Sequence, residues 1–199
     1  MPAGAGRISG DHDMTRIFIA AAVAGLLAGA TAADEIEATL EAALEAYRAG
    51  DIALAEEEAQ FAATLLGQMK AEGLKGYLPE PLAGWERRAG DDAAQSMAGF
   101  GGGVLARGRY AGPPGDVEIQ LMAENQLVAS MAAVLSNPAM MSQMGTVRRV
   151  GRQKLVVTRE GEVQALIEGK VLVQISGSAP EADKLAYFEA LDLEALAAF

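Results

Sequence analysis

Residues 146–176 read TVRRVGRQKLVVTREGEVQALIEGKVLVQIS, and this stretch decides the fold. It contains four runs rich in β-branched and aliphatic residues, which are interrupted at Gly151, Gly161 and Gly169. Such runs are typical of strands, and short breaks that contain glycine are typical of tight hairpins. The stretch therefore predicts an antiparallel meander whose strands cover 146–150, 154–159, 162–167 and 170–176.

The neighbouring segments extend this sheet and add helices. Two further strands are expected at 104–110 and 117–122, on either side of the turn sequence GPPGD. Helices are expected at 91–100, 127–135 and 139–144, and a last helix opens at Ser178 and Pro180. The order predicts an α+β fold, in which an N-terminal helical hairpin precedes an antiparallel β-sheet with helices packed on one face.

Residues 33–72 carry the pattern of the helical hairpin. In the first half, Ile36, Leu40, Leu44 and Tyr47 recur at helical spacing. The pair Gly50-Asp51 then suits the end of one helix and the start of the next. The second helix has its own apolar stripe, which consists of Leu54, Phe61, Leu65, Leu66 and Met69.

The sequence AYRAGDI at 46–52, followed by Ala55 and Ala59, resembles the core of one tetratricopeptide-type helical hairpin over about 34–72. The resemblance implies that small alanine side chains let the two helices approach closely. Such hairpins hide their apolar faces by stacking on neighbours, and the pattern occurs only once here. We therefore expect the hairpin to pack on the rest of the chain or on another molecule.

Residues 73–84 are rich in glycine and proline but also contain Tyr77, Leu78 and Leu82, so they predict an ordered crossover that leads into a domain at 85–199. The sequence LPEPLAGW at 78–85, together with the order of elements, is similar to small secreted α/β sandwiches of the PsbP/Mog1 kind. The likeness covers about 78–199 and is one of fold. It implies an accessory protein and carries no catalytic residues across.

The start of the chain predicts export. Met14 and Arg16 precede an uncharged apolar run at 17–29, and Ala30-Thr31-Ala32 fits the small-x-small cleavage pattern of a signal peptide. The run is too short for a membrane anchor, which needs about 20 residues. We expect a Sec-type signal at 14–32, a mis-assigned extension at 1–13, and a mature protein in the periplasm or outside the cell, with no stable membrane anchor.

Composition restricts the chemistry. The chain has 199 residues, a net charge of −11, no cysteine, and a single histidine at His12, ahead of the predicted cleavage site. The mature chain would therefore lack both imidazole and thiol groups, which excludes most catalytic dyads and triads. GGGVLA at 101–106 formally fits a dinucleotide-binding pattern, but it lies between a predicted helix and a predicted strand, as a turn would. We expect no enzyme activity, no catalytic residues and no cofactor.

Methionines form the first candidate site. Met122, Met131, Met140, Met141 and Met144 fall within one short stretch, and Met140 and Met144 share a helical face. Thioethers suit Cu(I), whereas methionine also fills irregular cores. The alternatives are a soft-metal site at Met140 and Met144, a methionine-lined apolar pocket or contact surface, and ordinary core packing.

Charged side chains form the second candidate. Residues 34–58 hold nine acids and only Arg48 as a base, and we expect this acidic hairpin to contact a protein partner or a second copy. Arg107, Arg109, Arg148 and Arg149 would hold an anionic ligand or the acidic hairpin if they shared a face; on alternating strands some would face solvent. Nucleic acid is not an expected partner, because the pI is about 4.6.

Overall fold

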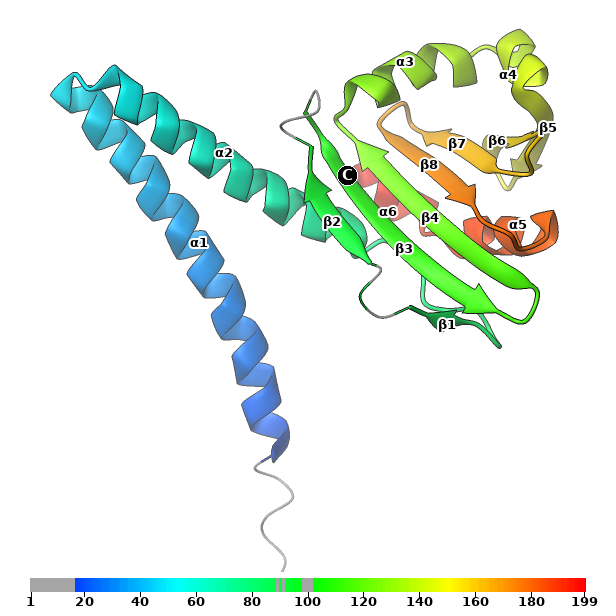
Figure 1. Ribbon diagram of the computed structural model, residues 1–199, viewed down its shortest axis with the longest axis horizontal. Helices are drawn as coiled ribbons and strands as arrows, with labels where there is room; N and C mark the ends of the chain where they lie inside the picture. Colours follow the sequence, from blue (N-terminus) through cyan, green and yellow to red (C-terminus); the bar gives the residue numbers. More distant parts are fainter. Residues whose placement is uncertain (1–16, 89, 91, 98–101) are drawn as a thin grey trace, which may run out of the picture. The chain divides into compact units, whose positions relative to one another are not determined.

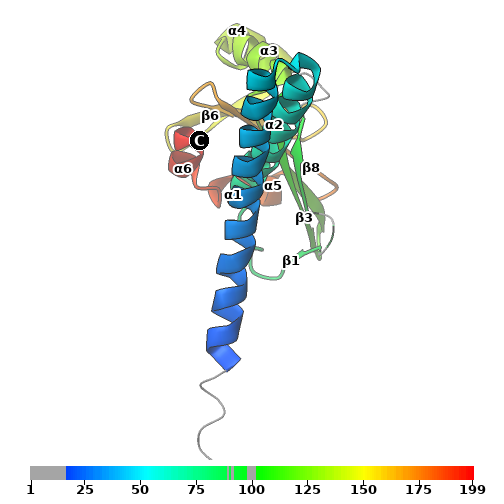
Figure 2. The ribbon, with the colours of Figure 1, turned by 90° about the vertical axis from the view of Figure 1, so that its left-hand side faces the viewer.

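The computed structural model describes residues 17–88, 90, 92–97 and 102–199, with side chains described from residue 32 onward (Figures 1 and 2). The described residues form two compact units, which we call the hairpin unit (residues 17–62) and the sheet unit (from residue 63 onward). Among the described residues, no helix combines the length and the apolar character that crossing a bilayer requires.

The hairpin unit contains α1 (Ile17–Ala49) and the start of α2 (Ile52–Lys75). Gly50 adopts φ 83°, in the left-handed region that suits glycine, and the amide of Asp51 donates to Ala46 O at 3.0 Å. The Asp51 carboxylate accepts from the amide of Leu54 at 3.1 Å and so caps α2. Two helices joined by a Gly-Asp turn are thus confirmed, whereas cleavage after Ala32 stays a prediction.

The sheet unit contains an antiparallel sheet of eight described strands, in the order β1-β3-β4-β8-β7-β6-β5, with β2 also paired to β3. The predicted meander is confirmed, since its four strands are consecutive in the sheet and its last strand pairs with β4. The strands are β1 (Glu86–Arg87), β2 (Ala93–Ser96), β3 (Val104–Gly112), β4 (Gly115–Ala123), β5 (Gly145–Val150), β6 (Gln153–Thr158), β7 (Val163–Ile167) and β8 (Val171–Ser176).

The helix expected at 91–100 is wrong where the structure describes it, because Ala93–Ser96 is strand β2. Ala93 pairs with Arg107 and Ser96 with Val104, so hydrogen bonding to β3 replaces the hydrogen bonds of a helix. A segment as short as AAQS has a weak preference of its own, and tertiary context overrides it. Residues 91 and 98–100 of the expected helix lie outside the described residues.

The expected α+β fold, with an N-terminal helical hairpin before an antiparallel sheet, is confirmed, and its helices pack on both faces of the sheet rather than on the one face expected. Along β8, Val171 and Val173 belong to one apolar cluster and Leu172 to another, and successive side chains of a strand point to opposite faces. The first face is covered by the C-terminal end of α2, by α5 (Glu181–Glu189) and by α6 (Leu193–Ala198). The other is covered by α3 (Gln126–Leu135) and α4 (Pro138–Met144).

Aromatic side chains tie the segment between α2 and the sheet to the first face. The rings of Trp85 and Tyr187 meet edge-on, with their centroids 5.3 Å apart. The ring centroids of Tyr187 and Tyr110 are 4.5 Å apart. The Tyr110 hydroxyl donates to Pro79 O at 2.6 Å. Burial raises the pKa of Tyr110 to about 12, although the nearby charge of Arg87 acts in the opposite direction, so the phenol stays protonated and keeps this hydrogen bond.

Gly67 marks a close approach of α2 to strand β2. A Cβ at this position would lie 2.9 Å from the Cβ of Ser96 and closer still to its Oγ, whereas a Cβ at Gly73 would meet nothing within 4 Å. We expect Gly67→Ala to lower the free energy of unfolding by about 1–3 kcal/mol through overpacking. Gly73→Ala, in the same helix, should raise it by up to about 1 kcal/mol through helix propensity.

Urea denaturation followed by circular dichroism measures both free energies of unfolding. Adding Ser96→Gly to Gly67→Ala removes the clashing side chain, so the double variant should recover most of the lost stability. Equal stability of the two alanine variants would contradict the close packing of α2 on β2.

Candidate functional site

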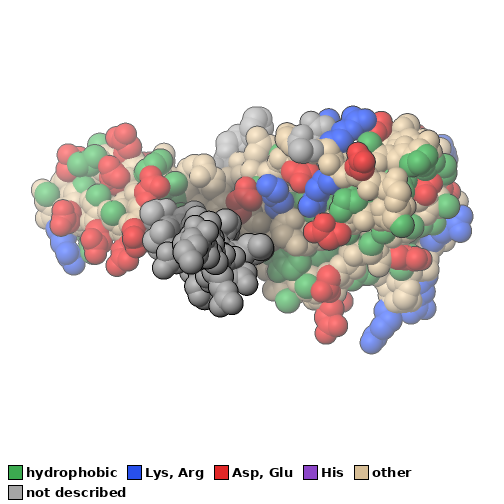
Figure 3. All heavy atoms as spheres, turned by 90° about the horizontal axis from the view of Figure 1, so that it is seen from below, with side chains coloured by type: hydrophobic (Ala, Val, Ile, Leu, Met, Phe, Trp, Pro, Cys, Tyr) green, Lys and Arg blue, Asp and Glu red, His purple; other side chains and the backbone are tan. Residues whose placement is uncertain are grey.

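The hairpin unit leaves its large apolar side chains exposed. Six of them are between 43% and 65% exposed: Leu40, Leu44, Tyr47, Ile52, Leu54 and Phe61. We call this set the hairpin surface. Acidic side chains lie among the hydrophobic ones on the hairpin, as Figure 3 shows at its left. The apolar stripe predicted for the first helix is thus present, but most of it faces outward.

The hairpin itself buries little. Within residues 32–62 the buried side chains are Ile36, Thr39, Ala46 and Ala62. Two of these four are alanines, and the Thr39 hydroxyl donates to Glu35 O of its own helix at 2.8 Å. Small residues let two helices come close but bury little apolar area, so they leave the larger side chains of the hairpin surface uncovered.

The candidate methionines lie mostly in the apolar cluster under α3 and α4. Met122 and Met141 are buried there, and Met131 and Met144 are partly buried against them. Met140 is exposed, on a different side of α4 from the buried Met141. The other buried members of the cluster are apolar too, which is the environment that core-filling methionines occupy: Leu105, Val128, Leu135, Val156 and Leu172.

The candidate arginines form two separate pairs. Arg107 and Arg109 lie on β3, and Arg148 and Arg149 lie on β5, with β4, β8, β7 and β6 between the two strands in the sheet order. Arg148 and Arg149 are exposed on this edge strand, and Arg148 forms an ion pair of 2.7 Å with Glu181. The four arginines therefore do not converge on one ligand.

Glu118 of β4 joins the β3 pair. Its carboxylate accepts from Arg109 Nε and from Gln120 Nε2, and it lies 3.4 Å from Arg107 Nε. Burial alone would raise the pKa of Glu118, but these hydrogen bonds and the two guanidinium charges outweigh it, so the pKa lies below its ordinary 4.5. The arginines thus hold a carboxylate of their own chain.

A row of amide side chains continues from this cluster across the sheet, and sequence analysis missed it. Arg107 pairs with Gln120, Gln120 with Gln174, and Gln174 with Gln164. Gln164 is buried, and its Oε1 atom has no hydrogen-bond partner among the described residues. The polar positions alternate with apolar ones in each strand, but their register across four strands depends on the pairing of segments far apart in sequence.

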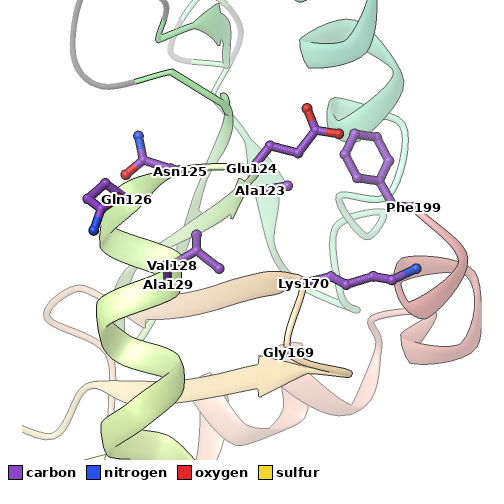
Figure 4. A pocket seen from close by; sticks show the side chains of 9 residues that line it. All are labelled: Ala123, Glu124, Asn125, Gln126, Val128, Ala129, Gly169, Lys170 and Phe199. Carbon is purple, nitrogen blue, oxygen red and sulfur yellow. The ribbon is translucent and has the colours of Figure 1, made fainter.

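A pocket with a volume of about 570 Å³ lies elsewhere in the sheet unit. Its walls are the junction of β4 and α3, the turn between β7 and β8, and Phe199 (Figure 4). Ala123 and Val128 are its buried apolar residues, while Glu124, Lys170 and Phe199 carry the longer side chains around it. Volumes of roughly 300–1,000 Å³ are typical of small-molecule sites.

A metal centre and a nucleotide-binding turn each require particular residues in a particular structural context. In the part of the chain that the structure describes, no three His, Cys, Asp or Glu side chains come together as a metal site would require. Val104 of the GGGVLA pattern opens strand β3 rather than a helix, which is the context of a turn, and Gly101 lies outside the described residues.

Comparisons of this chain with family models, curated proteins and solved structures found no match. The resemblances to a tetratricopeptide-type hairpin and to PsbP/Mog1-type sandwiches therefore stay predictions.

The lowered pKa of Glu118 predicts a pH dependence of stability. Because the folded state favours the carboxylate, Glu118 contributes stability above pH 4.5, and this contribution is lost as the pH falls through the lower folded pKa. We expect Glu118→Gln to be less stable than the wild type at pH 7 and the difference to narrow in acid. Denaturant titrations between pH 7 and acid measure this, with Glu189→Gln on the exposed end of α5 as control. A constant difference at all pH values would contradict the ionic role.

Proposed function

We propose that this chain is an exported, non-enzymatic accessory or scaffolding protein, which acts by docking a protein partner or a second copy through its hairpin surface. The single observation that carries the proposal is the exposure of six large apolar side chains on one short helical hairpin. A folded protein that gathers many large exposed apolar side chains on one element commonly uses them in an interface.

The spacing of these side chains suits a helical partner. Leu40, Leu44 and Tyr47 follow one another at four and three residues on α1, and Leu54 and Phe61 are seven residues apart on α2. Side chains spaced in this way lie along one side of a helix and can interdigitate with a neighbouring helix. A partner that covers them would bury the apolar face that a lone hairpin leaves in water.

Charge narrows the choice of partner. The acids of residues 34–58 surround the apolar stripes and are balanced only by Arg48. A partner with basic residues around an apolar groove would associate faster and in a defined orientation. The sequence also allowed a carrier of Cu(I) or of an apolar ligand in the methionine region. Since Met122 and Met141 are buried in an apolar cluster, their thioethers are packed in the core, and we place docking ahead of a Cu(I) carrier.

The docking proposal predicts the effect of replacing Leu44 and Tyr47, which are exposed on α1. We expect Leu44→Gln/Tyr47→Gln to weaken partner binding or self-association by at least about ten-fold, because aromatic and apolar anchors dominate such interfaces. Glu37→Gln/Glu41→Gln is the matched control on the same helix and should lose far less. Co-purification of the tagged full chain from its exported fraction, with light scattering for oligomeric state, measures both.

Two results would contradict docking. One is a wild-type protein that remains a monomer and retains no partner in its exported fraction. The other is a Leu44→Gln/Tyr47→Gln variant that binds as the wild type does. Circular dichroism of each variant establishes that α1 and α2 still form, so a loss of binding is not confused with unfolding.

Export makes a separate prediction about the N-terminus. We expect mass spectrometry of the exported protein to find Ala33 as its first residue, because the small residues at 30–32 fit signal peptidase. Replacing Ala30 and Ala32 with bulky residues should leave the precursor uncut. A secreted chain that retains residues 14–32, or a chain found only in the cytosol, would overturn the proposed export.

A further inference from the structure

The pocket of about 570 Å³ is bounded by three segments that lie far apart in the sequence. In Figure 4 the side chain of Glu124 extends toward the ring of Phe199, and Lys170 reaches out from the turn between β7 and β8. Val128 and Ala129 of α3 line the wall opposite the turn. The pocket therefore combines an apolar wall with two charged side chains at its rim.

Hydrogen bonds within the sheet unit hold the walls of the pocket. Asn125 accepts from the amide of Leu127 at 2.7 Å and donates to Gly102 O at 2.6 Å, which holds the start of α3. On the opposite side, the amide of Lys170 donates to Ile167 O at 2.9 Å and closes the turn. Because both walls are anchored in the sheet unit, the pocket is pre-formed and needs little ordering when it binds.

The two non-glycine residues with left-handed backbone in the described chain both flank this pocket. Glu124 has φ 54°, and Glu168, which immediately precedes the lining residues Gly169 and Lys170, has φ 46°. Such conformations are unfavourable for residues with a side chain, and they persist where the surrounding structure requires them. At Glu124 the conformation turns the chain from β4 into α3, which shapes one wall.

The charges at the rim are not equivalent. Both carboxylate oxygens of Glu124 accept from Lys70 Nζ at 2.8 Å, so this acid already has a counter-ion. The ammonium of Lys170 donates to Ala197 O at 3.2 Å, and it has two further protons to donate. No carboxylate within ion-pair distance of Lys170 is found among the described residues. Lys170 therefore supplies the one positive charge at the rim that still lacks an acid.

We propose that this pocket binds a small molecule with an apolar body and a single anionic group. The anionic group lies against the Lys170 ammonium, and the apolar body lies against Val128, Ala129 and the ring of Phe199. Because Lys170 is exposed, its charge sets selectivity and contributes modestly to affinity, while the apolar contacts provide most of the binding.

Sodium octanoate is the probe for this site, and it carries one carboxylate on an eight-carbon chain. The full chain labelled with ¹⁵N and ¹³C is titrated with octanoate, and the shifts of Val128, Ala129, Lys170 and Phe199 are followed by NMR. We expect saturable shifts at these residues, with a dissociation constant in the millimolar range or below. Octanol, which lacks the charge, and octylammonium, which reverses it, should each bind at least about five-fold more weakly.

Matched variants separate the two parts of the site. Lys170→Met removes the charge and should weaken octanoate binding about five-fold, without changing the affinity for octanol. Ala129→Phe fills the pocket and should abolish both. The controls are Lys154→Met on β6 and Ala133→Phe, the same change one turn further along α3 and outside the pocket lining.

Three results would overturn the proposal. The first is the absence of saturable shifts at the pocket residues at millimolar octanoate. The second is unchanged octanoate binding by Lys170→Met, and the third is tighter binding of octylammonium. The hairpin variant Leu44→Gln/Tyr47→Gln should bind octanoate as the wild type does, so failure of this site and failure of hairpin docking are distinguished.

Discussion

The burial of the central strands on both faces is the constraint on which the sheet unit depends. On β8, Val171 and Val173 face one layer of helices and Leu172 faces the other, and all three are fully buried. Each such side chain contributes about 1.5–3 kcal/mol of burial free energy. Neither helix layer is therefore optional, since removing either one would expose a continuous apolar surface of the same strands. The positions of α3, and hence of the pocket beside it, follow from this requirement.

Local signals were enough to predict the elements whose conformation is decided within a few residues. The glycine-punctuated meander of 146–176 and the capped turn at Gly50-Asp51 are confirmed because turn and cap chemistry specify them. Strand β2 was missed because its sequence AAQS becomes a strand only through pairing with β3. A sequence signal for the second helix layer was present but not recognised. LVV at 155–157 and VLV at 171–173 are continuous apolar runs, which indicate strands buried on both faces.

The candidate sites were less accessible to sequence reasoning. Four of the five candidate methionines lie in one apolar cluster, but only packing shows that Met141 is buried and Met140 exposed. The four arginines divide between β3 and β5 because strand order, which spacing does not encode, separates them. The pocket is assembled from segments near residues 124, 169 and 199, and nothing in any one of them marks a site. Its left-handed Glu124 lies at a position where glycine or asparagine would be the usual sequence signal.

The two units differ in how fully each buries its own apolar side chains. The sheet unit encloses two apolar clusters, with Tyr187 and Phe188 among its fully buried residues. The hairpin unit leaves Leu44 and Tyr47 in water. This contrast supports the proposal that the hairpin unit provides contact with a partner. The pocket lies wholly within the sheet unit, so the proposed ligand binding and the proposed docking can be tested separately.

The outermost strand of the meander has a consequence for solubility. β5 ends the described sheet, and its Thr146, Val147, Arg148 and Arg149 are all exposed, so its outer backbone is a ready template for another strand. If the β5 strands of two molecules paired, their arginine side chains would come close together. The repulsion between these like charges would oppose the pairing. Arg148 and Arg149 thus place charge on an edge strand, which is one of the ways in which edge strands disfavour pairing with another chain.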